Sequence, residues 1–343
     1  MDTLITIVCA VLLFGSLIFF HEFGHFITAK RNGIKVNEFS VGMGPKLISR
    51  QHGETMYSLR LLPLGGYCMM EGEDEDSDDE RSFSKAPVVS RILVVVAGAF
   101  NNVLLGFLIL MILTATGGSI TSRTVAQFYE GATTEQTGLQ VDDKIVAVNG
   151  SKVFIANDIY YVLQYVEDGK ADLTVIRDGE KIELNDVQFP LTTDEDGNQQ
   201  ISVDFMVYGV KKSVVTVFQA TVLEVLSMIK EIFASIAMLI TGAATVNELT
   251  GPIGIVSVIS EAASYGIRNV VYFAAYLSIN LGIMNMLPLP ALDGGKFVVL
   301  LFELITKKKP GQKLEIIINA AGLVFLLGLM IFITYNDIVR LFF

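Results

Sequence analysis

The chain has 343 residues, of which 52% are hydrophobic and only 18% are charged. Soluble proteins average about 25% charged residues, so this composition favours a membrane protein. The formal net charge is −11 and no basic patch stands out, which argues against nucleic acid as a partner. Two cysteines, Cys9 and Cys68, are too few for a disulfide framework.

Four stretches are long and apolar enough to cross a membrane, which takes about 20 mostly apolar residues as a helix. The first lacks the basic start and the cleavage site of a signal peptide, so we expect it to be retained. The sequence therefore predicts a polytopic α-helical membrane protein, with one span in 1–29 and two in 270–343. The predicted spans are residues 4–29, 92–114, 270–287 and 316–335.

The segment 30–91, between the first two spans, is mixed in character. It holds the β-prone, glycine-punctuated runs "FSVGMGPKLIS" and "TMYSLRLLPLGGYCMM". These runs predict a β-hairpin or small sheet that dips into the membrane. The acidic run 71–80 that follows, "EGEDEDSDDE", is typical of a solvated, flexible loop.

Residues 121–205 contain short alternating strands such as "KIVAVNG" and "DLTVIRDG", each ended by a turn signal. They predict a small β-rich domain inserted between the second and third spans. In the segment 213–263, the apolar run 232–246 is short for a span, which is typical of interfacial or re-entrant segments. We expect an amphipathic helix on the membrane surface, followed by a turn at 250–255, "TGPIGI".

Basic residues predict the orientation, because short loops rich in Lys and Arg stay in the cytoplasm. They gather in the segment 30–91 and in the loop after the third span, where Lys307, Lys308 and Lys309 are consecutive. Both loops are therefore expected in the cytoplasm. The β-rich domain and both termini are then expected on the extracytoplasmic side.

The first span contains "HEFGH", which matches the pattern H-E-x-x-H. On a helix, His21 and His25 share one face with their Cβ atoms about 5–6 Å apart, which suits two imidazole ligands of one Zn²⁺. Glu22 is too close in sequence to join that face as a ligand. It points toward a water that the metal acidifies and can act as the general base for it. Ionisable groups inside a span are costly, so they predict a functional site.

A hydrolytic zinc site needs a third protein ligand. His52 is one candidate, but it lies in a polar loop. Asp293, in "NMLPLPALDGGK", is the better one because Pro and Gly residues around it break the helix and leave backbone to line a cavity. If the run 232–246 does not cross the membrane, the first and third spans are parallel. Asp293 then reaches the depth of the two histidines, toward the cytoplasmic side.

These motifs resemble the paired signatures of the site-2 protease family of intramembrane zinc metalloproteases, over nearly the whole chain. The segments "EFSVGMGPKL" and "LPLGGYCMMEGEDED" resemble the family's membrane-associated β-hairpin, and "TGPIGI" a motif before the third span. "AGAFNN" resembles its Gly-Pro-x-x-Asn stretch, with Ala99 in place of Pro. Residues 130–153 resemble a PDZ domain in which Asp142 replaces a Gly, as in single-PDZ Gram-positive members.

The resemblance implies hydrolysis of peptide bonds within transmembrane segments of membrane proteins, such as anti-sigma factors or signal-peptide remnants. Substrates would be trimmed beforehand by another protease, and the other partner is membrane lipid. The external PDZ-like domain would filter substrates by size or read peptides. The family's roles, carried over by position, are zinc binding by His21, His25 and Asp293, general-base catalysis by Glu22, and substrate or oxyanion binding by Asn285 and Asn102.

Two other functions are compatible with parts of this pattern. A non-proteolytic membrane scaffold would use the PDZ-like domain for assembly, but it has no physical need for the buried Glu22. A metal transporter also places His and Asp in the membrane, but it requires a path of several weak sites. Two histidines and a carboxylate also suit Fe(II), so the ligand set favours zinc without excluding iron.

Overall fold

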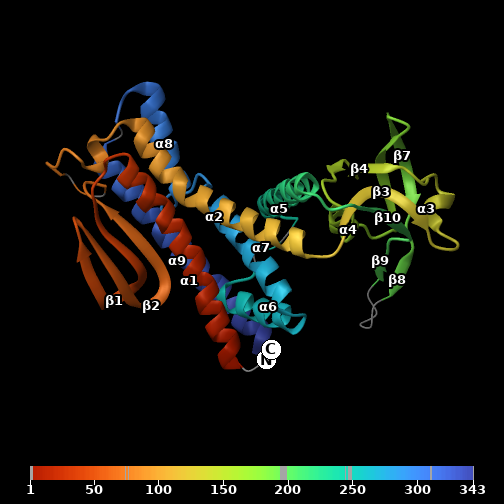
Figure 1. Ribbon diagram of the computed structural model, residues 1–343, viewed down its shortest axis with the longest axis horizontal. Helices are drawn as coiled ribbons and strands as arrows, with labels where there is room; N and C mark the ends of the chain where they lie inside the picture. Colours follow the sequence, from red (N-terminus) through yellow and green to blue (C-terminus); the bar gives the residue numbers. More distant parts are fainter. Residues whose placement is uncertain are drawn as a thin grey trace. The chain divides into compact units, whose positions relative to one another are not determined.

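The structure is a computed structural model that describes residues 3–73, 75, 77–193, 199–243, 245, 249–309 and 311–342. It divides into two compact units. The first combines Met1–Ile109 with Ile232–Phe343, and the second is Leu110–Glu231. Each is described by itself below, with the element labels of Figure 1.

Long helices dominate the first unit. Four helices in the described part of the chain are long and apolar enough to cross a membrane, as the sequence predicts. Three of them begin and end within a few residues of the predicted spans. The fourth extends further, past both ends of its predicted span. They are α1 (Thr3–Arg31), α2 (Val88–Thr116), α7 (Ile267–Asn285) and α9 (Gln312–Phe342), the second of which continues into the second unit.

Two shorter helices of this unit differ from the sequence prediction. The predicted turn 250–255 is instead the start of α6 (Pro252–Ser264), because proline fits the first helical position, where its missing N–H costs nothing. The chain after α7 forms a second short helix, α8 (Asp293–Thr306). The predicted amphipathic helix corresponds to α5 (Val214–Thr241), whose position at a membrane surface stays a prediction.

Small residues let α1, α2 and α7 approach closely. A Cβ on Gly24 of α1 would lie 2.3 Å from the Ala97 carbonyl oxygen of α2. A Cβ on Gly282 of α7 would lie 2.8 Å from the carbonyl oxygen of Ala99 on α2. Such contacts between backbones are typical of membrane helices, which gain little from burying apolar side chains against one another. The motifs "HEFGH" and "AGAFNN" are therefore in direct contact.

Asp337 of α9 caps the start of α6. Its carboxylate is buried and accepts hydrogen bonds from the backbone N–H groups of Gly251 and Gly254, at 3.1 and 2.9 Å. A carboxylate at a helix N-terminus satisfies free N–H groups and favours the positive end of the helix dipole. The end of α9 is thereby held against α6, which also packs on the beginning of α1 (Figure 1).

The predicted hairpin consists of β1 (Val36–His52) and β2 (Thr55–Met70), which pair antiparallel. Residues 38–41 of β1 pair with two stretches of β2, residues 56–59 on one side and residues 66–69 on the other. The hairpin lies alongside α1 (Figure 1), and its apolar face, with Phe39 and Cys68, packs on Phe19, Phe23 and Phe26 of α1.

Some residues of the acidic run after the hairpin form ion pairs with other segments. Asp79 lies 3.0 Å from Lys35, and Glu73 lies 2.7 Å from Lys296 of α8. The predicted solvated character therefore does not hold for Glu73, whose side chain is 15% exposed, whereas Glu75, Asp78 and Glu80 are exposed. Asp74 and Asp76 lie outside the described residues.

The second unit contains the predicted β-rich domain. Its main sheet has the strand order β10–β3–β4–β6–β7, and β5 pairs with β4. Asp142 adopts φ 71°, in the left-handed region that favours glycine. The bounds are β3 Ile120–Phe128, α3 Thr133–Gln136, β4 Lys144–Val148, β5 Ser151–Lys152, α4 Asn157–Leu163, β6 Lys170–Arg177, β7 Glu180–Gln188, β8 Leu191–Thr193, β9 Gln199–Ile201 and β10 Phe205–Val210.

Polar contacts hold the middle of α5 on this domain. Asp158 of α4 is buried, accepts a hydrogen bond from Ser227 Oγ and lies 2.9 Å from Lys230 Nζ. Both partners are on α5, which continues from the second unit into the first.

Candidate metal centre

Two histidines project from α1 toward α2. His21 and His25 are both buried, and α2 presents to them the residues Val94, Gly98 and Asn102, which recur at intervals of four along one helix face. A Cβ on Gly98 would lie 2.3 Å from His25 Nε2 and 2.9 Å from His21 Cε1. Only glycine therefore leaves room at this position for both imidazole rings.

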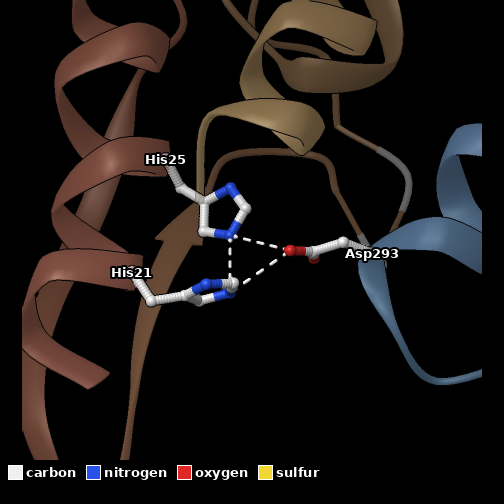
Figure 2. A group of neighbouring side chains, drawn as sticks. All are labelled: His21, His25 and Asp293. Carbon is white, nitrogen blue, oxygen red and sulfur yellow. Dashed lines mark hydrogen bonds and ion pairs between the residues drawn. The ribbon is translucent and has the colours of Figure 1, made fainter. Parts of the chain in front are cut away.

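The structure brings Asp293 to these histidines across more than 260 residues of sequence (Figure 2). Asp293 Oδ2 lies 3.2 Å from His21 Nε2 and 3.3 Å from His25 Nε2, and the two Nε2 atoms are 3.2 Å apart. Ligand atoms bound at 2.0–2.1 Å to a tetrahedral zinc stand about 3.3 Å apart. The triangle thus has the dimensions of three zinc ligands, with one tetrahedral position left open.

Asp293 reaches this place because the chain reverses tightly after α7. A Cβ on Gly294 would lie 2.1 Å from the Leu287 carbonyl oxygen, and one on Gly295 would lie 2.4 Å from that of Leu289. Both glycines are therefore needed for the first turn of α8 to pack on the preceding loop. Asp293 itself begins α8, where a carboxylate is favoured by the helix dipole.

The Asp293 carboxylate is suited to a cation. Its Oδ2 is buried and, within the described part of the chain, accepts no hydrogen bond of good geometry. A buried carboxylate oxygen without a donor is costly unless a metal ion or another cation meets it.

The other ring nitrogen of each histidine also has a partner. His25 Nδ1 lies 2.8 Å from the Val94 carbonyl oxygen, so it carries the proton and leaves Nε2 free as a ligand atom. His21 Nδ1 lies 3.3 Å from Asn102 Nδ2, while Asn102 Oδ1 is buried and has no partner among the described residues. Turning that carboxamide by 180° presents Oδ1 to His21 Nδ1–H, which gives both histidines the outer partners typical of metal ligands.

Glu22 does not belong to the triangle. The cluster of possible ligand atoms in the described residues comprises His21, His25 and Asp293 alone. Glu22 is close enough to all three to interact electrostatically. A Cβ on Gly66 of β2 would lie 3.3 Å from Glu22 Cγ, so Glu22 lies between the metal ligands and the hairpin.

The other residues predicted to bind metal or substrate lie outside the triangle. His52 is exposed at the end of β1, so it does not join the triangle. Asn285 is half-buried at the end of α7, and its substrate-binding role stays a prediction. Asn102 is fully buried against His21, which suits an orienting role better than contact with a substrate. The sequence reasoning missed Gly98 and the Val94 carbonyl, although the four-residue spacing on α2 is visible in the sequence.

Replacing Gly98 by alanine is expected to abolish metal binding, because the new Cβ would occupy the space of His25 Nε2. Metal content of the purified variant, measured by mass spectrometry, tests this. Gly15→Ala is a matched control: Gly15 lies on α1, and no described atom beyond its own stretch of helix lies within 4 Å of the new Cβ. Normal metal content in Gly98→Ala would show that the histidines do not bind metal at the observed position.

Comparison with known proteins identifies the family of the chain. The profile of peptidase family M50 matches residues 9–329. The chain belongs to peptidase family M50, the site-2 proteases. It is 34% identical to a protein of Clostridium perfringens provisionally named a zinc metalloprotease, over 97% of this chain and 98% of that one. It is also 29% identical to the regulator of sigma-W protease RasP of Bacillus subtilis, over 98% of this chain and 99% of RasP.

Family M50 membership, together with the four apolar helices, makes the chain a multi-pass membrane metalloprotease. The architecture predicted from the sequence, apolar spans with an inserted β-rich region, is confirmed. The two alternative functions, a non-proteolytic membrane scaffold and a metal transporter, are thereby set aside in favour of the enzyme.

Proposed function

We propose that His21, His25 and Asp293 hold a zinc ion and that Glu22 is the general base of peptide hydrolysis within transmembrane segments. The observation that carries this proposal is the triangle of two Nε2 atoms and one carboxylate oxygen with edges of 3.2–3.3 Å. Each histidine has an outer partner, and Glu22 stands beside the triangle without joining it.

Zinc bound there would supply Lewis acidity, acidifying water and polarising a peptide carbonyl. The chain's own residues do the rest. Glu22 takes the proton of the attacking water and delivers a proton to the leaving amine. Val94 and Asn102 keep the histidine rings oriented, and Gly98 keeps the space beside them open.

The hairpin can present the substrate to this centre. Residues 66–70 of β2 pair with β1 on one side, and no other strand in the described chain pairs with them. Gly66 at the start of this stretch faces Ile18 and Glu22 of α1. An unwound substrate segment added as a strand at this edge would bring its backbone next to Glu22, since strand addition uses main-chain hydrogen bonds.

Sidedness and substrates complete the proposal. The basic segments 30–91 and 296–313 support a metal centre toward the cytoplasm, with both termini and the β-rich domain outside. RasP is named as a regulator of sigma-W. By analogy, substrates here would be anti-sigma factors or signal-peptide remnants already trimmed by another protease, with the PDZ-like domain excluding bulky outer domains.

Chelation tests the requirement for metal. Purified protein in detergent is incubated with a synthetic transmembrane peptide of about 20–25 apolar residues that has a helix-breaking centre. Treatment with 1,10-phenanthroline is expected to stop cleavage, and stoichiometric zinc is expected to restore it, because hydrolysis depends on the three-ligand site. Cleavage that continues in metal-free protein would contradict the proposal.

A further inference from the structure

The helix that carries Asp293 is attached to the hairpin region by an ion pair that the proposed reaction does not use. Lys296 lies three residues after Asp293, so both project from the first turn of α8 on the same side. Lys296 Nζ lies 2.7 Å from Glu73 Oε1. The Glu73 side chain is only 15% exposed, so water and salt screen this pair less than a surface pair.

Glu73 is itself held in place. It follows β2 by three residues, at a point where the chain is bonded to the segment before α2. The Phe83 N–H donates to the Glu71 carbonyl oxygen at 2.7 Å, and the Ser84 N–H donates to that of Gly72 at 3.3 Å. Glu73 also lies within electrostatic range of Glu22. Its side chain therefore follows directly after a backbone segment, 71–72, that is hydrogen-bonded to residues 83–84.

The two ends of α8 are secured separately. Near its C-terminal end, Glu303 forms a buried ion pair with Arg91 of α2 at 2.6 Å. The residues on either side of the helix, Ala291 and Lys307, have φ values of 69° and 57°. At the N-terminal end, where Asp293 faces the two histidines of α1, the described residues also show an ion pair of Lys296 with Glu73.

We propose that the Glu73–Lys296 ion pair is a positioning element of the metal centre. It fixes the first turn of α8 against the end of the hairpin, so that Asp293 Oδ2 stays within ligand distance of both histidines. The same pair couples the strand that would hold substrate to the carboxylate that would hold metal. This inference rests on the proposed metal centre and adds two residues to it.

A double-mutant cycle measures the effect directly. Glu73→Gln, Lys296→Gln and the double variant are purified, and zinc affinity is measured by competition with a chromophoric chelator. Each single variant is expected to lose about 10-fold or more, the range seen when outer partners of metal ligands are removed. The double variant should lose no more than either single one, because both changes break one interaction.

Two further variants separate positioning from general stability. Lys296→Arg keeps the charge and is expected to retain most of the zinc affinity. Lys30→Gln breaks another ion pair, Lys30–Glu54 at 2.6 Å, whose lysine is exposed to a similar degree, and is expected to leave zinc affinity unchanged. Thermal unfolding of all variants is recorded beside the affinities.

The inference is overturned if both single variants bind zinc as tightly as the unmodified protein, or if their losses multiply in the double variant. It is equally overturned if Lys30→Gln weakens zinc as much as Lys296→Gln does. Failure of the metal centre itself is distinguishable, because the unmodified protein would then not bind zinc in the same assay.

Discussion

Replacing Glu22 by glutamine is expected to reduce peptide cleavage by about 10²–10⁴-fold, the usual contribution of a positioned acid–base group. The change keeps the size of the side chain and removes its ability to take a proton. Zinc content should stay at the level of the unmodified protein, because Glu22 is not part of the ligand triangle. Cleavage of the transmembrane peptide and zinc content are measured on the same preparation.

The same variant also distinguishes the other functions considered from the sequence. A scaffold would be unaffected by Glu22→Gln, and a transporter would keep its metal flux. In cells, the variant is expected to accumulate membrane-embedded fragments that the unmodified enzyme removes. Full cleavage by Glu22→Gln would exclude Glu22 as the base, and loss of zinc from it would place Glu22 among the ligands.

Replacing Asp293 by alanine is expected to have the second largest effect, on zinc affinity. The loss should exceed the about 10–100-fold that follows removal of an outer partner, because a direct ligand is lost. It also leaves the two Nε2 atoms 3.2 Å apart without the carboxylate that faces them. Zinc affinity is measured by chelator competition, and cleavage should disappear with it.

His52→Ala is the matched control for this experiment. His52 is exposed at the end of β1, so its removal is expected to leave both zinc affinity and cleavage unchanged. Unchanged affinity in Asp293→Ala, or a loss in His52→Ala, would mean that the third ligand has been wrongly chosen.

Much of the site could be predicted because its chemistry is local. The spacing of His21 and His25 places both on one helix face, whatever surrounds it. Asp293 was chosen as their partner because Pro and Gly residues surround it and because the first and third spans are parallel if 232–246 does not cross the membrane. Such reasoning needs the count and direction of helices but no detail of their packing.

The features that could not be predicted from the sequence depend on contacts between distant segments. Asn102 resembles a substrate-binding residue by position, but its burial against His21 is decided by how α1 packs on α2. The acidic run 71–80 has a solvated composition, yet Glu73 meets Lys296 from 223 residues away. The helix α8 was overlooked because its 14 residues are too few for a span and follow a Pro- and Gly-rich stretch.

The position of the metal itself tests the account most directly. A crystal of zinc-loaded protein, recorded on both sides of the zinc absorption edge, gives an anomalous map that locates the ion independently of the chain. We expect one strong peak about 2.0–2.2 Å from His21 Nε2, His25 Nε2 and an Asp293 carboxylate oxygen. A peak bound through other side chains, or histidines and aspartate that hold no ion, would contradict it.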